Sequence, residues 1–290
     1  MDTRSAAVRP WNACWICGST NLSIRRLKVP TRSFDATANI VEKTIDACAT
    51  CGYERDISIR SLSDALAIQG RFSTETPRVP RPTEAFWPRR PSLVGATIRK
   101  LCPNLRTALD VGCNAGLNLF ALGPAIHKFG IEMSPTLADV ATKFSGASVF
   151  QTPIEEFDWK GEPFDVVMSF AVIEHVYDPK AFVGRLLTFL RTGGVLILMT
   201  GDRESYTARK LGDAWPLYIS SDHVSFFSAK SVRNLLCRFD CEILREEWRF
   251  MYFHNGLGNV FSRLAMKTFE IGGLVRWPWH DLYYIYGRKR

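Results

Sequence analysis

From residue 107 onward, short apolar runs alternate with segments whose apolar residues recur every three or four positions. A short apolar run bounded by turn residues is typical of a buried strand, and the three-to-four spacing is typical of an amphipathic helix. Strands are predicted at 107–111, 127–132, 148–151, 164–170, 194–200, Cys241–Trp248 and Leu282–Tyr286. Helices are predicted at 117–123, 135–144, 179–191 and 229–238. This alternation predicts an α/β fold with a parallel sheet covered by helices on both faces.

The first third of the chain has a different pattern. Strand-like runs at Leu22–Leu27 and Ile40–Ile45 fit the two hairpins of a small β ribbon. Prolines interleaved with arginines then fill the segment Thr76–Pro91, which predicts an extended, semi-rigid linker. The chain is therefore divided into a ribbon domain at 1–75, a Pro/Arg-rich linker at 76–91 and an α/β domain at 92–290.

The junction between the first strand and the first helix of the α/β domain carries the most informative motif, Asp110-Val-Gly112-Cys-Asn114-Ala-Gly116. Glycines there can take positive φ angles and let a ligand approach the backbone closely. The second strand ends at Glu132, and an acid at that point can accept hydrogen bonds from both hydroxyls of a ribose. The turn is not the Gly-x-Gly-x-x-Gly of dinucleotide sites and no Gly-Lys-Ser/Thr follows, so a nucleoside ligand without a pyrophosphate is predicted.

This turn resembles the first motif of class I S-adenosylmethionine (SAM) dependent methyltransferases, and further matches follow in the family's order. Phe164–Pro179 is similar to the fourth strand and the segment after it, Leu190–Leu198 to the Gly-Gly turn into the fifth strand, and Asp222–Ser228 to a segment before the last helix of many small-molecule members. The resemblance covers about residues 85–290. The sequence departs from the family at Asn114, where a middle glycine is usual, although asparagine tolerates the left-handed region better than most residues.

The resemblance implies a Rossmann-like, seven-stranded methyltransferase sheet and SAM as the cofactor. It implies that the backbone of the glycine-rich turn approaches the methionine part, that Glu132 holds the ribose, and that Met133 and Ile154 pack on the adenine. Ser169 and Phe170 are expected to line the methyl-donor end. The full set of expected cofactor-binding residues is Asp110, Gly112, Cys113, Asn114, Gly116, Glu132, Met133, Ile154, Ser169 and Phe170.

Two Cys-x-x-Cys-Gly knuckles lie in the ribbon, 30 residues apart. Each spacing lets two thiolates face one ion, and two such pairs supply the four sulfurs of a tetrahedral zinc site. A redox dithiol or a disulfide is the alternative, and the two matching knuckles favour zinc. Because Cys14, Cys17, Cys48 and Cys51 would fill all four positions with sulfur, the predicted zinc is structural rather than catalytic.

Methyl transfer to an oxygen or a nitrogen usually requires removal of a proton from the acceptor, and histidine has a pKa suited to that role. His175 and His223 each lie in a loop at the expected cofactor-facing edge, so both are candidate bases. Each has a structural alternative. Glu174-His175 more often supports structure in the family. Asp222 either orients His223, or the Asp222–His223 pair caps the next helix. Methyl transfer itself is an in-line displacement, and its rate depends mainly on the proximity and alignment of the two reactants.

Composition sets the outer bounds. The length of 290 residues and the hydrophobic content of 46% are ordinary for a globular protein of one or two domains. The sequence contains no apolar run long enough to span a membrane, and its start lacks the apolar core of a secretory signal, so a cytoplasmic location is the default expectation. Residues 1–100 hold 16 basic and 9 acidic residues and so carry most of the net charge of +8. That bias fits either an anion-binding surface or a solvated, arginine-rich face.

The segment from Phe250 to His280 mixes aromatic and basic residues. A substrate lid, a contact with a membrane surface and a helix packed on the sheet edge are the three interpretations left open for it.

Three functions are open at this stage. The first is a SAM-dependent methyltransferase acting on a small molecule, such as a sugar or a glycan or lipid intermediate; the Asp222–Ser228 segment and the ribbon type favour it. The second is an RNA methyltransferase whose basic ribbon binds phosphates. It is not favoured, because the sequence lacks the Asn/Asp-Pro-Pro-Tyr/Phe motif of base-amine methylation and the catalytic cysteines of uracil methylation. The third is a non-catalytic binding module that retains the SAM fold, and Asn114 is the feature in its favour. The oligomeric state is not indicated.

Overall fold

The computed structural model describes residues 12–30, 40–59, 61–65, 67, 89–250 and 280–290. Its larger sheet has seven strands in the order β10-β11-β8-β7-β4-β5-β6. These are β4 (Thr107–Val111), β5 (His127–Ile131), β6 (Ser148–Phe150), β7 (Phe164–Phe170), β8 (Leu190–Gly201), β10 (Cys241–Phe250) and β11 (His280–Lys289). Strands β4 to β8 run parallel, and β11 pairs antiparallel with both β8 and β10. The predicted α/β fold with a seven-stranded sheet is confirmed, with an antiparallel edge.

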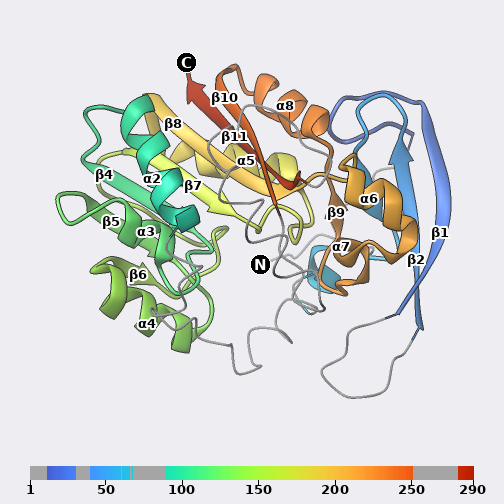
Figure 1. Cartoon of the computed structure of the whole chain (residues 1–290), viewed down its shortest axis with the longest axis horizontal. Helices are drawn as coiled ribbons and strands as arrows, with labels where there is room; N and C mark the ends of the chain where they lie inside the picture. The colour runs from blue at the N-terminus through green and yellow to red at the C-terminus, as the bar shows by residue number, and fades with distance from the viewer. Residues whose placement is uncertain (1–11, 31–39, 60, 66, 68–88, 251–279) are drawn as a thin grey trace, which may run out of the picture.

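Helices cover both faces of this sheet (Figure 1). They are α2 (Arg89–Leu101), α3 (Leu117–Ala121), α4 (Pro135–Ser145), α5 (Pro179–Thr188) and α8 (Ala229–Cys237). Neighbouring residues of a strand point to opposite faces. Ala108 and Val166 therefore pack in one cluster with α2, α3 and α4, whereas Leu109 and Val167 pack in another with α5 and α8.

Local chemistry explains where several helices begin. Ser134 caps α4 by accepting a hydrogen bond from Leu137 N, and Pro135 occupies the first turn. Ser228 and Ser231 form a reciprocal capping box at the start of α8. The predicted end of the 179–191 helix at residue 191 was wrong. α5 ends at Thr188 and β8 begins at Leu190, because residues 191–194 bulge out of register with β7 instead of continuing the helix.

A second, four-stranded antiparallel sheet has the order β1-β2-β3-β9. Its first three strands, β1 (Leu22–Pro30), β2 (Ile40–Cys48) and β3 (Glu54–Asp56), come from the ribbon, and β9 (Ser225–Phe226) comes from the α/β part of the chain. α6 (Tyr206–Leu211), the 3-10 turn η1 (Gly212–Ala214) and α7 (Pro216–Ile219) were not predicted. They pack against this sheet at the right of Figure 1, where Trp215 and Tyr218 join the ribbon's Leu27 and Ile45 in one core cluster. The ribbon is thus built into the rest of the molecule.

None of the described helices is long and apolar enough to cross a membrane. Residues 251–279, to which the lid, membrane-contact and edge-packing interpretations apply, lie outside the described part of the chain. Most of the proposed linker is also outside it, although α2 already begins at Arg89.

Candidate active site

A cavity of about 250 Å³ opens at the carboxyl ends of β4 and β5. This edge of a parallel sheet is where α/β folds bind their ligands. The wall includes Gly112, Glu132, Met133, Ile154 and His175. Residues predicted from separate motifs along the sequence therefore meet around one space.

The glycine-rich turn takes the conformation that its sequence requires. Gly112 and Gly116 have φ angles of +76° and +77°, a region that side chains rarely enter. A Cβ atom at Gly112 would also lie 2.4 Å from a methyl group of Val172, which lines the cavity. Asn114 is left-handed as well, with φ +49°, and its Oδ1 accepts a hydrogen bond from Ala115 N at 2.7 Å. Asparagine at this position is therefore compatible with the turn.

Glu132 is held in place by main-chain donors. Its Oε2 accepts a hydrogen bond from Asn114 N and its Oε1 accepts one from Ser134 N, both at 2.9 Å. Each carboxylate oxygen can accept a second hydrogen bond. Glu132 is therefore both oriented and able to accept hydroxyl groups from a ligand in the cavity.

Asp110 lies on β4, two residues before Gly112, and its side chain is fully buried. Neither carboxylate oxygen has a hydrogen-bond partner of acceptable geometry among the described residues. Burial, followed by the charge on Glu132, raises the pKa of Asp110 to about 8, against an opposing effect of the Asn118 side chain. A buried carboxyl group without a partner is costly, and the ammonium group of a methionine moiety has the charge and the donors that it lacks.

Several expected cofactor residues do not lie on the described cavity wall. The Cys113 side chain is buried and points toward Gly130 in the core. Ser169 is buried and donates a hydrogen bond to Val111 O at 3.0 Å, and Phe170 packs near Tyr284. Cys113, Ser169 and Phe170 thus support the strands that carry the site.

His175 lies on the cavity wall and contacts an acid. Its Nδ1 is 3.1 Å from Asp222 Oδ2 and 3.2 Å from the main-chain oxygen of Asp222. Burial lowers the pKa of His175, but the hydrogen bond that it donates to Asp222 and the charge on Glu174 outweigh this effect, so the net shift is upward. The same contact lowers the pKa of Asp222 despite its burial. An acid–histidine pair of this kind fixes the tautomer of the ring and favours its protonated form.

His223 stands behind His175 and off the cavity wall. The two ring centroids are 4.6 Å apart, and His223 Nδ1 is 2.9 Å from Leu217 O. Burial, followed by the charge on His175, lowers the pKa of His223 to about 3, so this ring is neutral near pH 7. Glu174, His175 and His223 offer ligand atoms within 4.8 Å of one another, an arrangement close enough for the three groups to influence each other's protonation.

Two groups of wall residues were missed by the sequence reasoning. Tyr177 and Phe182 follow His175 in the chain and line the cavity, so the position of the motif could have pointed to them. Leu62 and Ala65 come from the part of the predicted ribbon domain that follows β3. Nothing in their local sequence marks them, because only the tertiary fold brings them to the cavity.

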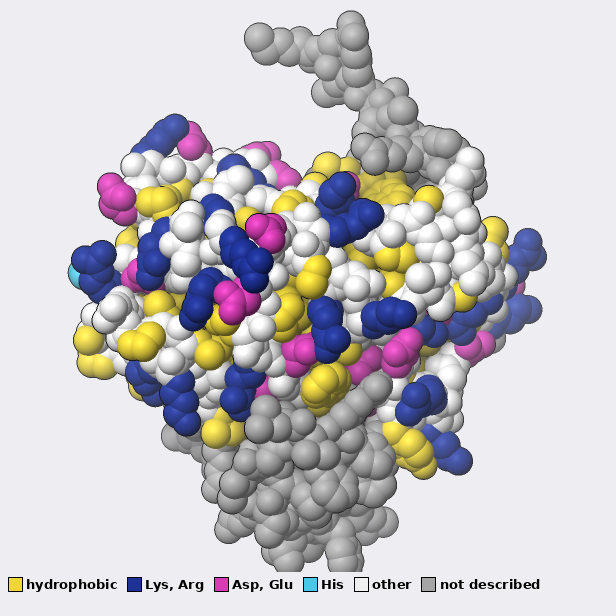
Figure 2. All heavy atoms as spheres, turned by 90° about the horizontal axis from the view of Figure 1, so that it is seen from above, with side chains coloured by type: hydrophobic (Ala, Val, Ile, Leu, Met, Phe, Trp, Pro, Cys, Tyr) yellow, Lys and Arg dark blue, Asp and Glu magenta, His cyan; other side chains and the backbone are white. Residues whose placement is uncertain are grey.

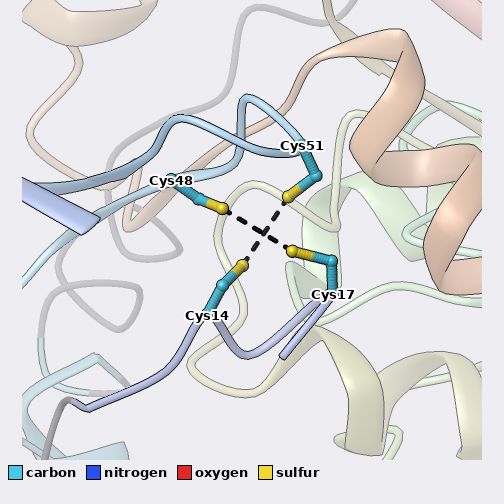
Figure 3. A group of neighbouring side chains, drawn as sticks. All are labelled: Cys14, Cys17, Cys48 and Cys51. Carbon is cyan, nitrogen blue, oxygen red and sulfur yellow. Dashed lines mark hydrogen bonds between the residues drawn. The ribbon is translucent and has the colours of Figure 1, made fainter. Parts of the chain in front are cut away.

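The four predicted zinc ligands come together at one point. Figure 3 shows the sulfurs of Cys14, Cys17, Cys48 and Cys51 directed at a common centre. The Cys14–Cys51 and Cys17–Cys48 sulfur distances are both 3.6 Å, and all four sulfurs lie within 4.8 Å of one another. Sulfurs bound to one zinc ion at 2.3 Å in a tetrahedron are about 3.8 Å apart. The cysteines present therefore fit zinc.

A group of three side chains in mutual contact connects this cluster with the cavity. Trp15 lies between the two cysteines of the first knuckle, and Tyr177 lies on the cavity wall. The two rings meet edge to face with their centroids 5.8 Å apart. The Arg55 guanidinium packs against both, 3.6 Å from the Trp15 ring centroid and 4.2 Å from that of Tyr177. Contacts of this kind are strongest when they are desolvated, and Arg55 is 1% exposed.

Residues 84–246 match the model of a family described as "Methyltransferase domain". The match covers more than half of the chain. The chain belongs to this methyltransferase family.

Individual known methyltransferases are similar to the chain over shorter stretches. A probable S-adenosylmethionine-dependent methyltransferase of Mycolicibacterium smegmatis is 27% identical over 126 residues, which are 43% of this chain and 49% of that protein. A ubiquinone biosynthesis O-methyltransferase of Rhodopseudomonas palustris is 36% identical over 103 residues, 33% of this chain and 40% of that protein. The chain thus spans about half or less of the length of the curated relatives that it matches.

Two solved methyltransferase structures share the fold. One is from Thermotoga maritima and is described as a possible histamine N-methyltransferase; it has a TM-score of 0.50 and 22% identity, and the likeness covers 70% of this chain and 91% of the other. The other is the plantazolicin methyltransferase BpumL in complex with S-adenosylhomocysteine, with a TM-score of 0.51, 17% identity and coverage of 81% and 93%.

Proposed function

We propose that the protein transfers a methyl group from SAM to a small-molecule acceptor, such as a sugar or a glycan or lipid intermediate. The observation that carries the proposal is the position of His175, which pairs with Asp222, on the wall of the cavity that also includes Gly112 and Glu132. A proton acceptor and several of the expected cofactor residues then face the same space, as methyl transfer to an oxygen or a nitrogen requires.

The residues of the cavity suit the three parts of SAM, which supplies an electrophilic methyl group when bound. Glu132 would accept hydrogen bonds from the ribose hydroxyls, and Met133 and Ile154 would pack against the adenine. The turn at Gly112 would approach the methionine part, with Asp110 as the partner of its ammonium group. Cys113, Asn114, Gly116, Ser169 and Phe170 would act by shaping the backbone around it.

His175 is the better candidate base of the two histidines. Asp222 accepts the hydrogen bond from Nδ1–H, so His175 Nε2 is the atom that would take the proton of the acceptor. The carboxylate then stabilises the imidazolium that forms. His223, off the cavity wall and neutral, supports the pair from behind.

We infer that the four cysteines hold a structural zinc ion. All four positions of a tetrahedral site would be sulfur, which leaves no position for water or substrate. The cluster lies in the ribbon, and Cys14, Cys48 and Cys51 belong to the same core cluster as strand residues of the larger sheet. Metal binding would thereby contribute to folding of the ribbon against the methyltransferase part. Elemental analysis of protein purified without added metal tests this inference, and about one zinc per chain is expected.

RNA as the acceptor has less support. Within the described ribbon, Lys43 is buried, Arg25 pairs with Glu54, and Arg55 packs against two aromatic rings. On the face shown in Figure 2, Lys and Arg side chains are interspersed with Asp and Glu. Phosphate binding needs cations that are exposed and close together, and much of this charge is used inside the protein.

Two measurements test the proposal. Calorimetry of the zinc-loaded protein with SAM and with S-adenosylhomocysteine is expected to show binding of both, and absence of binding would leave a non-catalytic module. Transfer of a labelled methyl group to a cell extract, followed by separation into RNA, protein, lipid and small-molecule fractions, is expected to label the small-molecule or lipid fraction. Label confined to RNA would overturn the choice of acceptor.

A further inference from the structure

Lys43 is a lysine of β2 that lies inside the protein, with 2% of its surface exposed. Its Nζ donates hydrogen bonds to the main-chain oxygens of Ser220 at 2.7 Å and of His223 at 3.0 Å. Asp56 Oδ2, on the neighbouring strand β3, is 3.9 Å from Nζ, and the Phe226 ring centroid is 5.4 Å away. A buried ammonium group requires hydrogen-bond partners, and Lys43 finds two of them in the loop at 220–223.

The two carbonyl groups that Lys43 binds lie on either side of Asp222. Asp222 is also the residue whose carboxylate and main-chain oxygen contact His175 Nδ1. Ser220 Oγ donates a further hydrogen bond to Asp222 Oδ1. The loop is therefore held by the ribbon on one side and by the candidate base on the other.

The strand that follows the loop continues this connection. Val224 N and Ser225 N both donate to Glu174 O, at 2.9 Å and 3.0 Å. Ser225 then pairs with Arg55 of β3. Main-chain bonds thus hold the loop next to His175, and Lys43 adds a charged anchor at the loop itself.

We propose that Lys43 is a positioning residue for the candidate base. By holding the carbonyl groups of Ser220 and His223, its ammonium keeps Asp222 in contact with the His175 imidazole. This inference rests on the proposed function for the role of His175, and it gives the ribbon a part in building the active site.

The surrounding charges agree with this role. The titratable groups facing His175 are Glu174, Asp222 and His223. After burial and His175, the charge on Lys43 contributes to lowering the pKa of His223. A neutral His223 does not compete for the Asp222 carboxylate. Burial lowers the pKa of Lys43, and the carboxylates of Asp56 and Asp222 oppose that effect.

The test is an NMR titration of histidine side chains in the full-length, zinc-loaded protein with S-adenosylhomocysteine bound. The His175 signal is assigned from its absence in a His175→Gln variant. In Lys43→Met we expect the pKa of His175 to fall by about half a unit to one unit, the size of shift that loss of a nearby charged hydrogen-bond partner produces. Lys43→Arg keeps the hydrogen-bond donors and the positive charge, so the pKa of His175 in this variant is expected to stay close to the wild-type value.

The control is Lys28→Met, since Lys28 lies on the adjacent strand β1 and its side chain is 74% exposed. It should leave the His175 titration unchanged, and S-adenosylhomocysteine affinity should stay within twofold in every variant. A folded Lys43→Met protein with the wild-type His175 titration overturns the proposal. If Lys43→Met does not fold, Lys43→Gln is measured instead. Glutamine is uncharged and one atom shorter than lysine, so it cannot reach both carbonyl groups; the pKa of His175 should again fall, and the wild-type titration overturns the proposal.

Methyl transfer by His175→Gln separates this inference from the proposed function. If that variant is as active as the wild type, the base role of His175 fails. The titration of His175 in Lys43→Met still decides whether Lys43 positions the ring.

Discussion

At the scale of single residues, the His175–Asp222 pair makes the most direct prediction. Replacing His175 with glutamine should lower kcat about 100-fold, which is the usual contribution of a positioned general base to the rate. It should change the Kd of SAM less than threefold. The upward-shifted pKa of His175 means that the neutral, reactive ring accumulates only above the usual histidine range. We therefore expect wild-type kcat/KM to rise with pH through that pKa and to level off above it.

The control for this experiment is His127→Gln, because His127 begins β5 and is exposed. It should behave like the wild type. Asp222→Asn should move the rising limb of the profile to lower pH, since the main favourable partner of the imidazolium is then gone. If kcat/KM rises over the same pH range in the wild type, His175→Gln and Asp222→Asn, a group other than His175 sets the pH dependence.

Asp110 makes a prediction in which stability and binding change in opposite directions. Its pKa is about 8 in the folded protein and about 3.9 in an unfolded chain. Between these values the folded state retains a proton that the unfolded state has lost, so the free energy of unfolding should fall as pH rises from about 4 to about 8. Asp110→Asn should remove this slope, stabilise the protein near pH 8 by about 1–3 kcal/mol, and weaken SAM binding at least tenfold.

Denaturant unfolding across pH, with calorimetry for SAM, measures both effects. Asp165→Asn is a control for which the opposite change in stability is expected. Although Asp165 is buried, its hydrogen bonds with Arg191 and with main-chain donors lower its pKa, so its loss should destabilise the protein at neutral pH. If Asp110→Asn destabilises the protein near pH 8, this would contradict the view that the buried carboxyl group lowers stability until a ligand binds.

At the scale of elements, the start of α8 also contacts the four-cysteine cluster. Ser228 Oγ accepts a hydrogen bond from Ser231 N and donates one to Cys51 O at 2.6 Å. Ser228→Ala should therefore remove both a helix cap and a partner of the knuckle, at a cost of about 2–4 kcal/mol in the free energy of unfolding. After removal of the metal, the cost should fall to about 1 kcal/mol, the share of the cap alone.

Ser134→Ala provides the matched comparison, because Ser134 caps α4 and the bond that it accepts comes from its own helix. Its cost should be about 1 kcal/mol with or without metal. Equal costs for Ser228→Ala before and after metal removal would show that the knuckle does not depend on this contact.

The elements also show what the sequence could reveal. Strands such as β4 and β7 were predicted at the observed bounds, because continuous apolar runs are typical of strands buried on both faces. β9 was missed because it has two residues and exists only through pairing with Glu54 and Arg55, far away in the chain. Lys43 was missed for a related reason: a lysine in a strand indicates a solvent-facing position, and its burial depends on the loop at 220–223.

At the candidate site, the sequence was informative where backbone geometry depends on residue type. The left-handed turn at Gly112 and the acid at Glu132 are local signals. The choice between His175 and His223 was not local, since it depends on which ring reaches the cavity wall.

At the scale of the whole molecule, removal of the metal should lower the local stability of the cavity wall. The contacts among Trp15, Arg55 and Tyr177 connect the first knuckle with the cavity wall, and β3 pairs with β9 next to the candidate base. Chelation should therefore speed amide hydrogen exchange in residues 172–177 and 222–226 as well as in the ribbon. The central strands β4 and β7 should keep their protection, because they are covered on both faces.

Hydrogen exchange followed by mass spectrometry, with and without S-adenosylhomocysteine, measures this response. Faster exchange limited to residues 12–59 would mean that the ribbon and the cavity are energetically independent. Faster exchange in β4 and β7 would mean instead that loss of metal unfolds the whole protein.

The pairing of β3 with β9 has a consequence for biosynthesis. Glu54 leaves the ribosome roughly 170 residues before its partner Phe226, which at 5–20 residues per second is a delay of about 10–30 seconds. During this interval the nascent ribbon has β3 as an open edge, and open edges invite pairing with other chains. The polar Glu54-Arg55-Asp56 sequence of β3 is the kind of charged edge that resists such pairing. The newly made ribbon is therefore expected to depend on these charges to avoid pairing with other chains until β9 has been synthesised.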